Sequence, residues 1–205
     1  MGKDKISPSE NKGQVVIIDY GAGNIQSIKF AIERLGFTAT LSDNSEEIRN
    51  ADKVIFPGVG EASSAMRKLK ESGLDSLIPE LQQPVLGICL GMQLMCNYSE
   101  EGDTEGLKIF DVDVVRFRES VKIPQIQWNS ITSLKGPLFE NVENEEFIYM
   151  VHSYYAPVTD ETIAVCEYGI PYGAAFAKAN FYGTQFHPEK SSSTGAQILK
   201  NFLKL

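Results

Sequence analysis

The strongest candidate for a catalytic group is Cys89, which lies in the segment Gly87-Ile88-Cys89-Leu90-Gly91. Glycines two residues either side of a nucleophile suit a tight strand-to-helix turn, where larger side chains would clash in the strained backbone. A helix that begins after Cys89 turns its positive end toward the sulfur, which favours the thiolate and offers N–H groups to an oxyanion. The alternative is a buried structural cysteine at the end of a strand.

A thiol nucleophile needs a base, and the chain offers two histidines, His152 and His187. His187 lies just past a predicted strand in Gln185-Phe186-His187-Pro188-Glu189, where Glu189 can hold the imidazole in the tautomer that faces the thiol. His152 is the rival base, but no acidic residue lies within three positions of it. We predict a catalytic triad of Cys89, His187 and Glu189; otherwise His187 is a turn histidine that caps the next helix.

Composition narrows the class of protein. Of the 205 residues, 42% are hydrophobic and 22% charged, which suits one globular domain with a sizeable core. The formal net charge of −8 disfavours a nucleic-acid partner, because such proteins concentrate lysine and arginine. The cysteines show no metal-ligand spacing, so we expect no metal site and reduced thiols in the cytoplasm. We assign Cys96, in a predicted apolar helix, and Cys166, in a predicted strand, to the core.

The N-terminal segment differs in composition from the rest of the chain. Residues 1–13 are polar and contain no signal-peptide core, so we predict a flexible tail, followed by one domain over 14–205. No apolar run reaches the roughly 18 residues that indicate a membrane span.

Strands alternate with helices in the first half of the chain. Predicted strands cover 15–18, 53–56 and 84–88, and the helices that follow them cover 25–35, 61–71 and a segment from Leu90. Asn24 and Gly36 suit the cap positions of the first helix. In the second half, we expect antiparallel strands at 111–117, 147–151, 163–167 and 174–179, then a strand at 181–185 and a helix over 191–203. This order predicts an α/β fold whose mainly parallel central sheet is flanked by helices, with additional antiparallel strands in the C-terminal half.

Two motifs together resemble those of the class I glutamine amidotransferases. The signature of that class combines a Gly-x-Cys-x-Gly-x-Gln elbow, here Gly87 to Gln93, with a distant His-Pro-Glu, here residues 187–189. Within the class, residues 14–205 resemble the family of glutaminase subunits of imidazole glycerol phosphate synthase. That likeness rests on the strings Asp19-Tyr20-Gly21-Ala22-Gly23-Asn24, Pro57-Gly58-Val59-Gly60, Trp128-Asn129, His152-Ser153-Tyr154-Tyr155 and Lys190-Ser191. Gln127 stands where this family commonly has glycine.

The resemblance implies a glutaminase of histidine biosynthesis that needs no cofactor. Cys89 would attack the glutamine amide, His187 would protonate the departing ammonia, and Glu189 would hold His187. Ammonia would pass to a cyclase, a (β/α)8-barrel synthase subunit in a heterodimer. That subunit would form imidazole glycerol phosphate and an aminoimidazole carboxamide ribotide.

Further residues are expected to hold the substrate and the partner. The oxyanion donors would be the N–H of Leu90 and an N–H from Gly58 or Val59, and Gln93 would help to hold glutamine. Because glycines precede and follow Val59, the Gly58-Val59 peptide could rotate in response to the partner. Trp128, with polar neighbours on both sides, predicts a place at the partner interface; the alternative is a core tryptophan.

Three other interpretations stay open from the sequence. They are an intracellular cysteine peptidase or related hydrolase, a non-catalytic module that retains the fold, and a class I glutaminase that serves a different synthase, for example in sugar modification. The His-Pro-Glu motif disfavours the first, and the intact triad disfavours the second. The strings at 19–24 and 57–60 disfavour the third.

Overall fold

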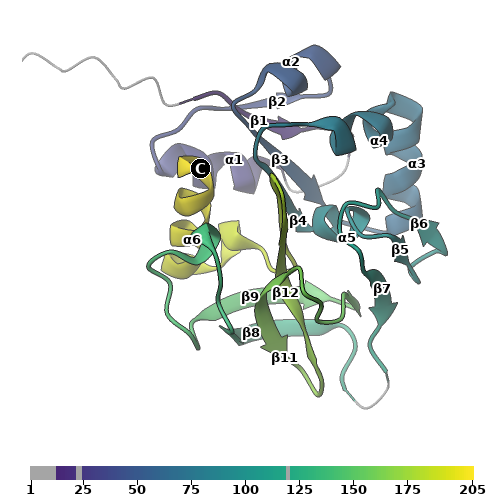
Figure 1. The fold of residues 1–205 in the computed structure, drawn as a ribbon, viewed down its shortest axis with the longest axis vertical. Helices are drawn as coiled ribbons and strands as arrows, with labels where there is room; N and C mark the ends of the chain where they lie inside the picture. The colour runs from purple at the N-terminus through teal and green to yellow at the C-terminus, as the bar shows by residue number, and fades with distance from the viewer. Residues whose placement is uncertain (1–12, 22–24, 119–120) are drawn as a thin grey trace, which may run out of the picture.

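The structure, a computed structural model, describes residues 13–21, 25–118 and 121–205. Within them, nine strands form a large sheet and four form a small one (Figure 1). The order across the large sheet is β2 (Ala39–Ser42), β1 (Val15–Ile18), β3 (Lys53–Gly58), β4 (Val85–Cys89), β13 (Phe181–Thr184), β12 (Pro171–Lys178), β11 (Thr162–Glu167), β8 (Gln125–Thr132) and β9 (Phe147–His152). The small sheet contains β10 (Tyr154–Tyr155), β7 (Asp113–Arg116), β5 (Tyr98–Ser99) and β6 (Thr104–Glu105).

The large sheet has a parallel half and an antiparallel half. Strands β2, β1, β3, β4 and β13 pair in parallel. Strands β13, β12, β11, β8 and β9 pair antiparallel. β13 therefore joins the two halves. Because parallel strands end at the same edge of a sheet, the end of β4 at Cys89 lies near the segment that follows β13.

Helices cover both faces of the parallel half. They are α1 (Ile25–Arg34), α2 (Ser45–Asn50), α3 (Ala62–Ser72), α4 (Leu74–Leu77), α5 (Leu90–Leu94) and α6 (Ser192–Lys204), with 3-10 turns η1 (Ile78–Glu80), η2 (Pro137–Phe139) and η3 (Pro188–Lys190). In Figure 1, α1 and α6 lie on one side of β3 and β4, and α3, α4 and α5 lie on the other. β1 and β4 are buried along their whole length, as strands covered on both faces should be.

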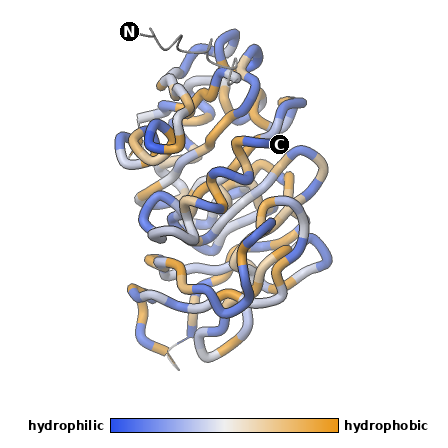
Figure 2. The backbone as a smooth tube through the Cα atoms, turned by 90° about the vertical axis from the view of Figure 1, so that its left-hand side faces the viewer, coloured by the Kyte–Doolittle hydropathy of each residue, from blue (hydrophilic) through white to orange (hydrophobic). Residues whose placement is uncertain are grey.

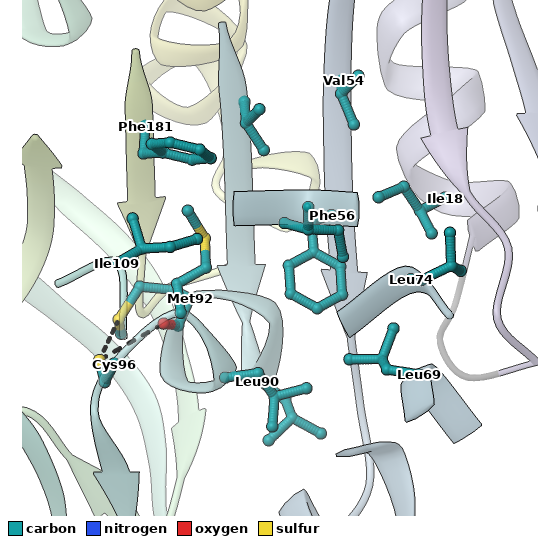
Figure 3. Close-up of a cluster of buried hydrophobic side chains, with 14 of the residues drawn as sticks. Ile18, Val54, Phe56, Leu69, Leu74, Leu90, Met92, Cys96, Ile109 and Phe181 are labelled. Carbon is teal, nitrogen blue, oxygen red and sulfur yellow. Dashed lines mark hydrogen bonds between the residues drawn. The ribbon is translucent and has the colours of Figure 1, made fainter. Parts of the chain in front are cut away.

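Two hydrophobic clusters lie on the two faces of the sheet. One contains residues of α3, α4 and α5 together with β3 and β4, and Figure 3 shows Met92, Phe56 and Leu69 in it. The other contains residues of α1 and α6, such as Ile32 and Phe202. Hydrophobic and hydrophilic segments alternate along the backbone, as Figure 2 shows. The clusters hold β4, and with it Cys89, between two packed layers.

The predicted fold class is confirmed, and so are the three strand-to-helix units of the first half. β3 continues through Gly58, beyond the predicted strand end, because it pairs with β4 as far as Cys89. The sequence patterns missed β2, α2, α4, β8 and three strands of the small sheet (β5, β6 and β10). α2 is short and polar, and its N-cap is Asn44, whose side chain accepts the N–H groups of Glu46 and Glu47.

The N-terminal residues and two of the cysteines were also the subject of predictions. The expected tail, apart from Gly13, and the Asn24 cap lie outside the described residues. Cys96 is buried, but α5 ends at Leu94, so Cys96 lies in the turn beyond the helix and not within it. Cys166 is buried in β11, as predicted. In the part of the chain that the structure describes, no helix has the length and apolar character that crossing a membrane requires.

Candidate active site

Cys89 lies at the junction of β4 and α5. Its backbone has φ 53° and ψ −112°, a conformation that is strained for a residue with a side chain. A Cβ atom on Gly91 would overlap the Phe56 carbonyl oxygen, and one on Gly87 would overlap the Met95 sulfur. Packing therefore requires both glycines of the elbow. α5 has only five residues, so it offers the N–H groups of its first turn more than a long helix dipole.

The structure brings His187 and Glu189 to the sulfur of Cys89. His187 Nδ1 lies 2.8 Å from Glu189 Oε1, and both side chains are buried. Burial lowers the pKa of His187, but hydrogen bonds with the Cys89 sulfur and Glu189 outweigh it and raise this pKa to about 10. These contacts favour the imidazolium form, with Nδ1 held by Glu189 and Nε2 left for Cys89.

Ser191, which the sequence analysis quoted only within a family string, fixes the turn that carries His187. Its Oγ donates to the His187 carbonyl at 2.7 Å and accepts the Tyr149 N–H at 3.0 Å. The His187 N–H also donates to the Tyr149 carbonyl at 3.3 Å. The turn after β13 is therefore tied to β9, and this limits the movement of the imidazole relative to Cys89.

The sulfur of Cys89 faces a pocket of about 320 Å³, within the range of about 300–1,000 Å³ that small-molecule sites occupy. The predicted site residues Val59, Leu90, Gln93 and His187 all line it with Cys89. A larger hollow of about 440 Å³ between α3 and β6 has no cysteine or histidine in its wall. Across residues 13–21, 25–118 and 121–205, no group of three or more His, Cys, Asp or Glu side chains is placed to hold a metal ion.

His152, the rival base, also lines the pocket, but both of its ring nitrogens are engaged elsewhere. Nδ1 lies 2.7 Å from the Tyr154 carbonyl and Nε2 lies 3.2 Å from the Tyr172 hydroxyl. Burial, aided by the nearby His187, lowers the pKa of His152 to about 4 despite the hydrogen bond to Tyr154. His152 is therefore neutral at physiological pH, and the geometry favours His187 as the base.

The expected oxyanion residues lie beside the sulfur. Gly58 pairs with Cys89 across β3 and β4, and a Cβ atom on Gly58 would overlap the Gly91 nitrogen. Val59 is 40% exposed at the pocket, and Gly60 has φ 97° with open space around it. The predicted strand ended at residue 56, but β3 includes Pro57 and Gly58, so only Val59 and Gly60 form the loop. Gly60 is therefore the position at which the loop backbone has room to change, whereas Gly58 is fixed by packing.

Gln93 lies in the pocket wall, and both protons of its amide nitrogen are hydrogen-bonded. Nε2 donates to the Tyr154 carbonyl at 2.9 Å and to Gln185 Oε1 at 2.8 Å. Gln185 Nε2 in turn lies 3.9 Å from the Cys89 sulfur. These contacts fix which end of the Gln93 amide can serve a ligand, namely Oε1.

Trp128 is a surface residue, as its polar neighbours predicted. It is 47% exposed on β8, and its ring meets Tyr149 edge to face at 6.1 Å. Ile126 and Phe147, each 58% exposed, lie on the same face of the β8–β9 pair. The core alternative for Trp128 is wrong, and an apolar surface of Ile126, Trp128 and Phe147 lies on these two strands.

Comparison with known proteins identifies the family. The family model for glutamine amidotransferase class-I matches residues 16–205. The chain belongs to the class-I glutamine amidotransferase family. A solved structure described as a glutamine amidotransferase matches this chain's fold with a TM-score of 0.73 at 16% identity, covering 93% of this chain and 97% of that one.

Curated relatives of this amidotransferase include imidazole glycerol phosphate synthase subunits. The subunit HisH from Bacteroides fragilis (strain YCH46) is 54% identical over 195 residues, which cover 94% of this chain and 100% of the relative. Subunit HisH from Vibrio parahaemolyticus is 45% identical over 200 residues, which cover 94% of this chain and 98% of the relative.

Two charged residues of the amidotransferase pocket were missed by the sequence analysis as site residues. Glu101 and Lys190 both line it. Glu101 Oε2 accepts the Ala62 N–H at 2.9 Å, and burial raises the pKa of this carboxyl. Glu101 stands in an acidic, turn-rich stretch with no motif of its own, so only the fold shows that it reaches the pocket.

Proposed function

We propose that this class-I amidotransferase is the glutaminase subunit of imidazole glycerol phosphate synthase and supplies ammonia for histidine biosynthesis. The observation that carries the activity is the contact of His187 with both Cys89 and Glu189 at a ligand-sized pocket. The 54% and 45% identity to HisH subunits over nearly the whole chain supports the pathway. Residues 14–205 act as one domain in the cytoplasm, where the free cysteines stay reduced.

The catalytic cycle has two covalent steps. The Cys89 thiolate adds to the glutamine amide carbon, and the His187 imidazolium protonates the nitrogen as the C–N bond breaks, which releases ammonia and leaves a thioester. His187 then takes a proton from water, whose oxygen attacks the thioester carbon. The C–S bond breaks, which releases glutamate and restores the Cys89 thiolate beside the imidazolium. Glu189 keeps Nδ1 of His187 protonated, so Nε2 remains the group that moves protons.

The negative charge that develops on the substrate oxygen needs N–H donors. In this proposal they are the N–H groups of Leu90 and Val59, on either side of the sulfur. Glutamine also carries an ammonium and a carboxylate. The carboxylate of Glu101 and the Oε1 of Gln93 supply acceptors for the ammonium, and Lys190 supplies a cation for the carboxylate.

The partner in this proposal is a (β/α)8-barrel cyclase subunit that receives the ammonia in a heterodimer. The apolar surface of Ile126, Trp128 and Phe147 suits the centre of such an interface, where tryptophan is enriched. It neighbours the pocket, because Ile126 pairs with Val151 of β9, which lines the pocket. Ammonia released there has a short path to a protein bound on this face.

Replacing Trp128 with alanine is expected to weaken partner binding by about 10- to 100-fold, because truncation of a central interface aromatic costs about 2 kcal/mol or more. The melting temperature is expected to change little, since the ring is half exposed. Calorimetric titration with the partner and thermal unfolding of the free subunit measure the two effects. Val158→Ala, at the same 47% exposure, is the control. Unchanged affinity with a large loss of stability would contradict this role.

Partner binding is expected to switch the oxyanion loop at Val59-Gly60, directly after β3. We expect the glutaminase rate of the chain alone to rise about 100- to 1,000-fold with nucleotide-loaded partner, the cost of one missing oxyanion donor. Gly60→Ala should lower the ratio of stimulated to basal rate about tenfold, because φ 97° is strained for alanine and the resting loop shifts. Glutamate formation with the chain alone, with partner, and with partner plus nucleotide tests both statements.

The matched control for this loop is Gly136→Ala, since Gly136 also has a positive φ, 74°, and open space around it. Gly58→Ala is unsuitable, because its Cβ atom would displace the elbow. Equal rates under all three conditions would contradict the switch, and no glutamate under any of them would contradict the proposed function. Loss of all activation on exchange of the cyclase for a different barrel synthase would confirm the partner.

A further inference from the structure

A continuous line of buried polar groups runs from β8 to Gln93 in the pocket wall. Gln125 Oε1 lies 2.9 Å from the Tyr172 hydroxyl, which lies 3.2 Å from His152 Nε2. His152 Nδ1 lies 2.7 Å from the Tyr154 carbonyl, and that carbonyl also accepts Gln93 Nε2 at 2.9 Å. Gln125 and Tyr172 are fully buried, and His152 and Gln93 nearly so. We call Gln125, Tyr172, His152 and the Tyr154 carbonyl the relay.

The protons of the relay can be assigned by counting donors. Burial raises the pKa of Tyr172 and lowers that of His152, so Tyr172 keeps its proton and His152 is neutral. The Tyr154 carbonyl can only accept, so the imidazole proton lies on Nδ1 and Nε2 must accept. The single Tyr172 proton therefore goes to His152 Nε2 and does not also serve Gln125. The Cys166 thiol contacts both Tyr172 and Gln125, but a thiol is only a weak donor.

The Gln125 amide completes the assignment. Gln125 Oε1 faces the Tyr172 hydroxyl, whose proton is already donated to His152. Gln125 Nε2 is buried and has no hydrogen-bond partner among the described residues. Exchange of the two amide positions, which leaves the shape of the side chain almost unchanged, lets Nε2 donate to the Tyr172 oxygen. All donors then point one way, from Gln125 through Tyr172 and His152 to the Tyr154 carbonyl.

We propose that Tyr172 is a positioning residue for glutamine binding, because this relay holds the Tyr154 carbonyl and thereby orients the amide of Gln93. The inference rests on the proposed glutaminase function. Both protons of Gln93 Nε2 are taken, by the Tyr154 carbonyl and Gln185, so Oε1 is presented to the pocket as an acceptor. A Gln93 amide turned the other way would present donors and repel the substrate ammonium.

The packing of Tyr172 separates its hydroxyl from its ring. The ring contacts Phe117 at 5.5 Å and Tyr155 at 5.8 Å, so Tyr172→Phe keeps these aromatic contacts and removes only the hydroxyl. His152 then loses its donor, and the hold on the Tyr154 carbonyl loosens. Cys89, His187 and Glu189 are untouched, so binding of glutamine should suffer more than the chemical step.

The test is the steady-state kinetics of the nucleotide-loaded complex. Tyr172→Phe is expected to raise the KM for glutamine about tenfold, the worth of one buried hydrogen bond, with kcat changed by less than about threefold. Gln125→Met removes only the first donor, so it should raise KM less, and the double variant should match Tyr172→Phe alone. Tyr182→Phe, on β13 with its ring against Phe202, is the control and should change neither constant.

Each outcome decides something. Three results would overturn the relay and leave the glutaminase in place. They are an unchanged KM in Tyr172→Phe, a fall in kcat as large as the rise in KM, or a KM increase in the double variant that is the sum of those in the two single variants. A parent complex that forms no glutamate would overturn the proposed function instead. The ¹⁵N spectrum of His152 then still tests the relay without turnover. We expect a protonated Nδ1, a bare Nε2 and a shift of the Nε2 signal in Tyr172→Phe; an Nε2–H tautomer would contradict the assignment.

Discussion

The Cys89→Ser variant is expected to hydrolyse glutamine at least about 1,000-fold more slowly than the parent, because loss of a covalent nucleophile removes the acylation route. The fold should survive, since serine and cysteine differ little in size and Cys89 is held by the glycines around it. Synthesis from added ammonia by the complex should continue at the parent rate, because the partner needs no thiol from this chain. Glutamate release and ammonia-dependent product formation measure the two halves.

A glutamine analogue that alkylates thiols provides the control for Cys89. The other cysteines, Cys96 and Cys166, are 0% and 1% exposed, and burial raises the pKa of both. Labelling should therefore occur once per chain in the parent and not at all in Cys89→Ser. Parent-like hydrolysis by the serine variant, or labelling at another cysteine, would show that the nucleophile lies elsewhere.

The second large effect is expected at the base. His187→Asn should lower kcat about 1,000-fold or more, because asparagine can neither protonate the leaving ammonia nor activate water. His152→Asn should lower kcat less than about tenfold and act mainly on the KM for glutamine, since His152 only positions other groups. Pre-steady-state acylation separates these effects.

The two histidine variants control each other, as both replace a buried imidazole of the same pocket. A larger kcat loss in His152→Asn than in His187→Asn would assign the base to His152. The raised pKa of His187, about 10, adds a pH criterion. The imidazolium is present below this value and lost above it, so the acylation rate of the parent should fall as the pH rises through about 10.

The residues of the candidate site could be singled out from the sequence because their signals are local. The elbow requires two glycines within five residues, and Glu189 lies two residues from His187, so each motif can be recognised in a short window. The parallel strands were equally clear, since full burial makes them continuous apolar runs. What joins the two motifs is the pairing of β4 with β13, which no local pattern encodes.

Each of the elements and residues that the sequence patterns missed was missed for a physical reason. β8 has eight residues, as many as β12. Its apolar residues Ile126 and Trp128 point to solvent, while Gln125 lies in the core. A strand whose apolar residues lie at the surface and whose polar residue lies in the core reverses the usual pattern. Glu101, Ser191 and Tyr172 act through contacts with residues distant in the sequence, and these follow only from the packed fold.

The place of β13 between β4 and β12 has a consequence during synthesis on the ribosome. Cys89 emerges about 100 residues before His187, which at roughly 5–20 residues per second is a delay of about 5 to 20 s. Until β13 inserts, the sheet halves that carry Cys89 and the β8–β9 surface are unconnected. In the proposed mechanism, a nascent chain therefore has the thiol but not the imidazolium that releases ammonia, so it would spare glutamine until the proposed partner surface is also formed.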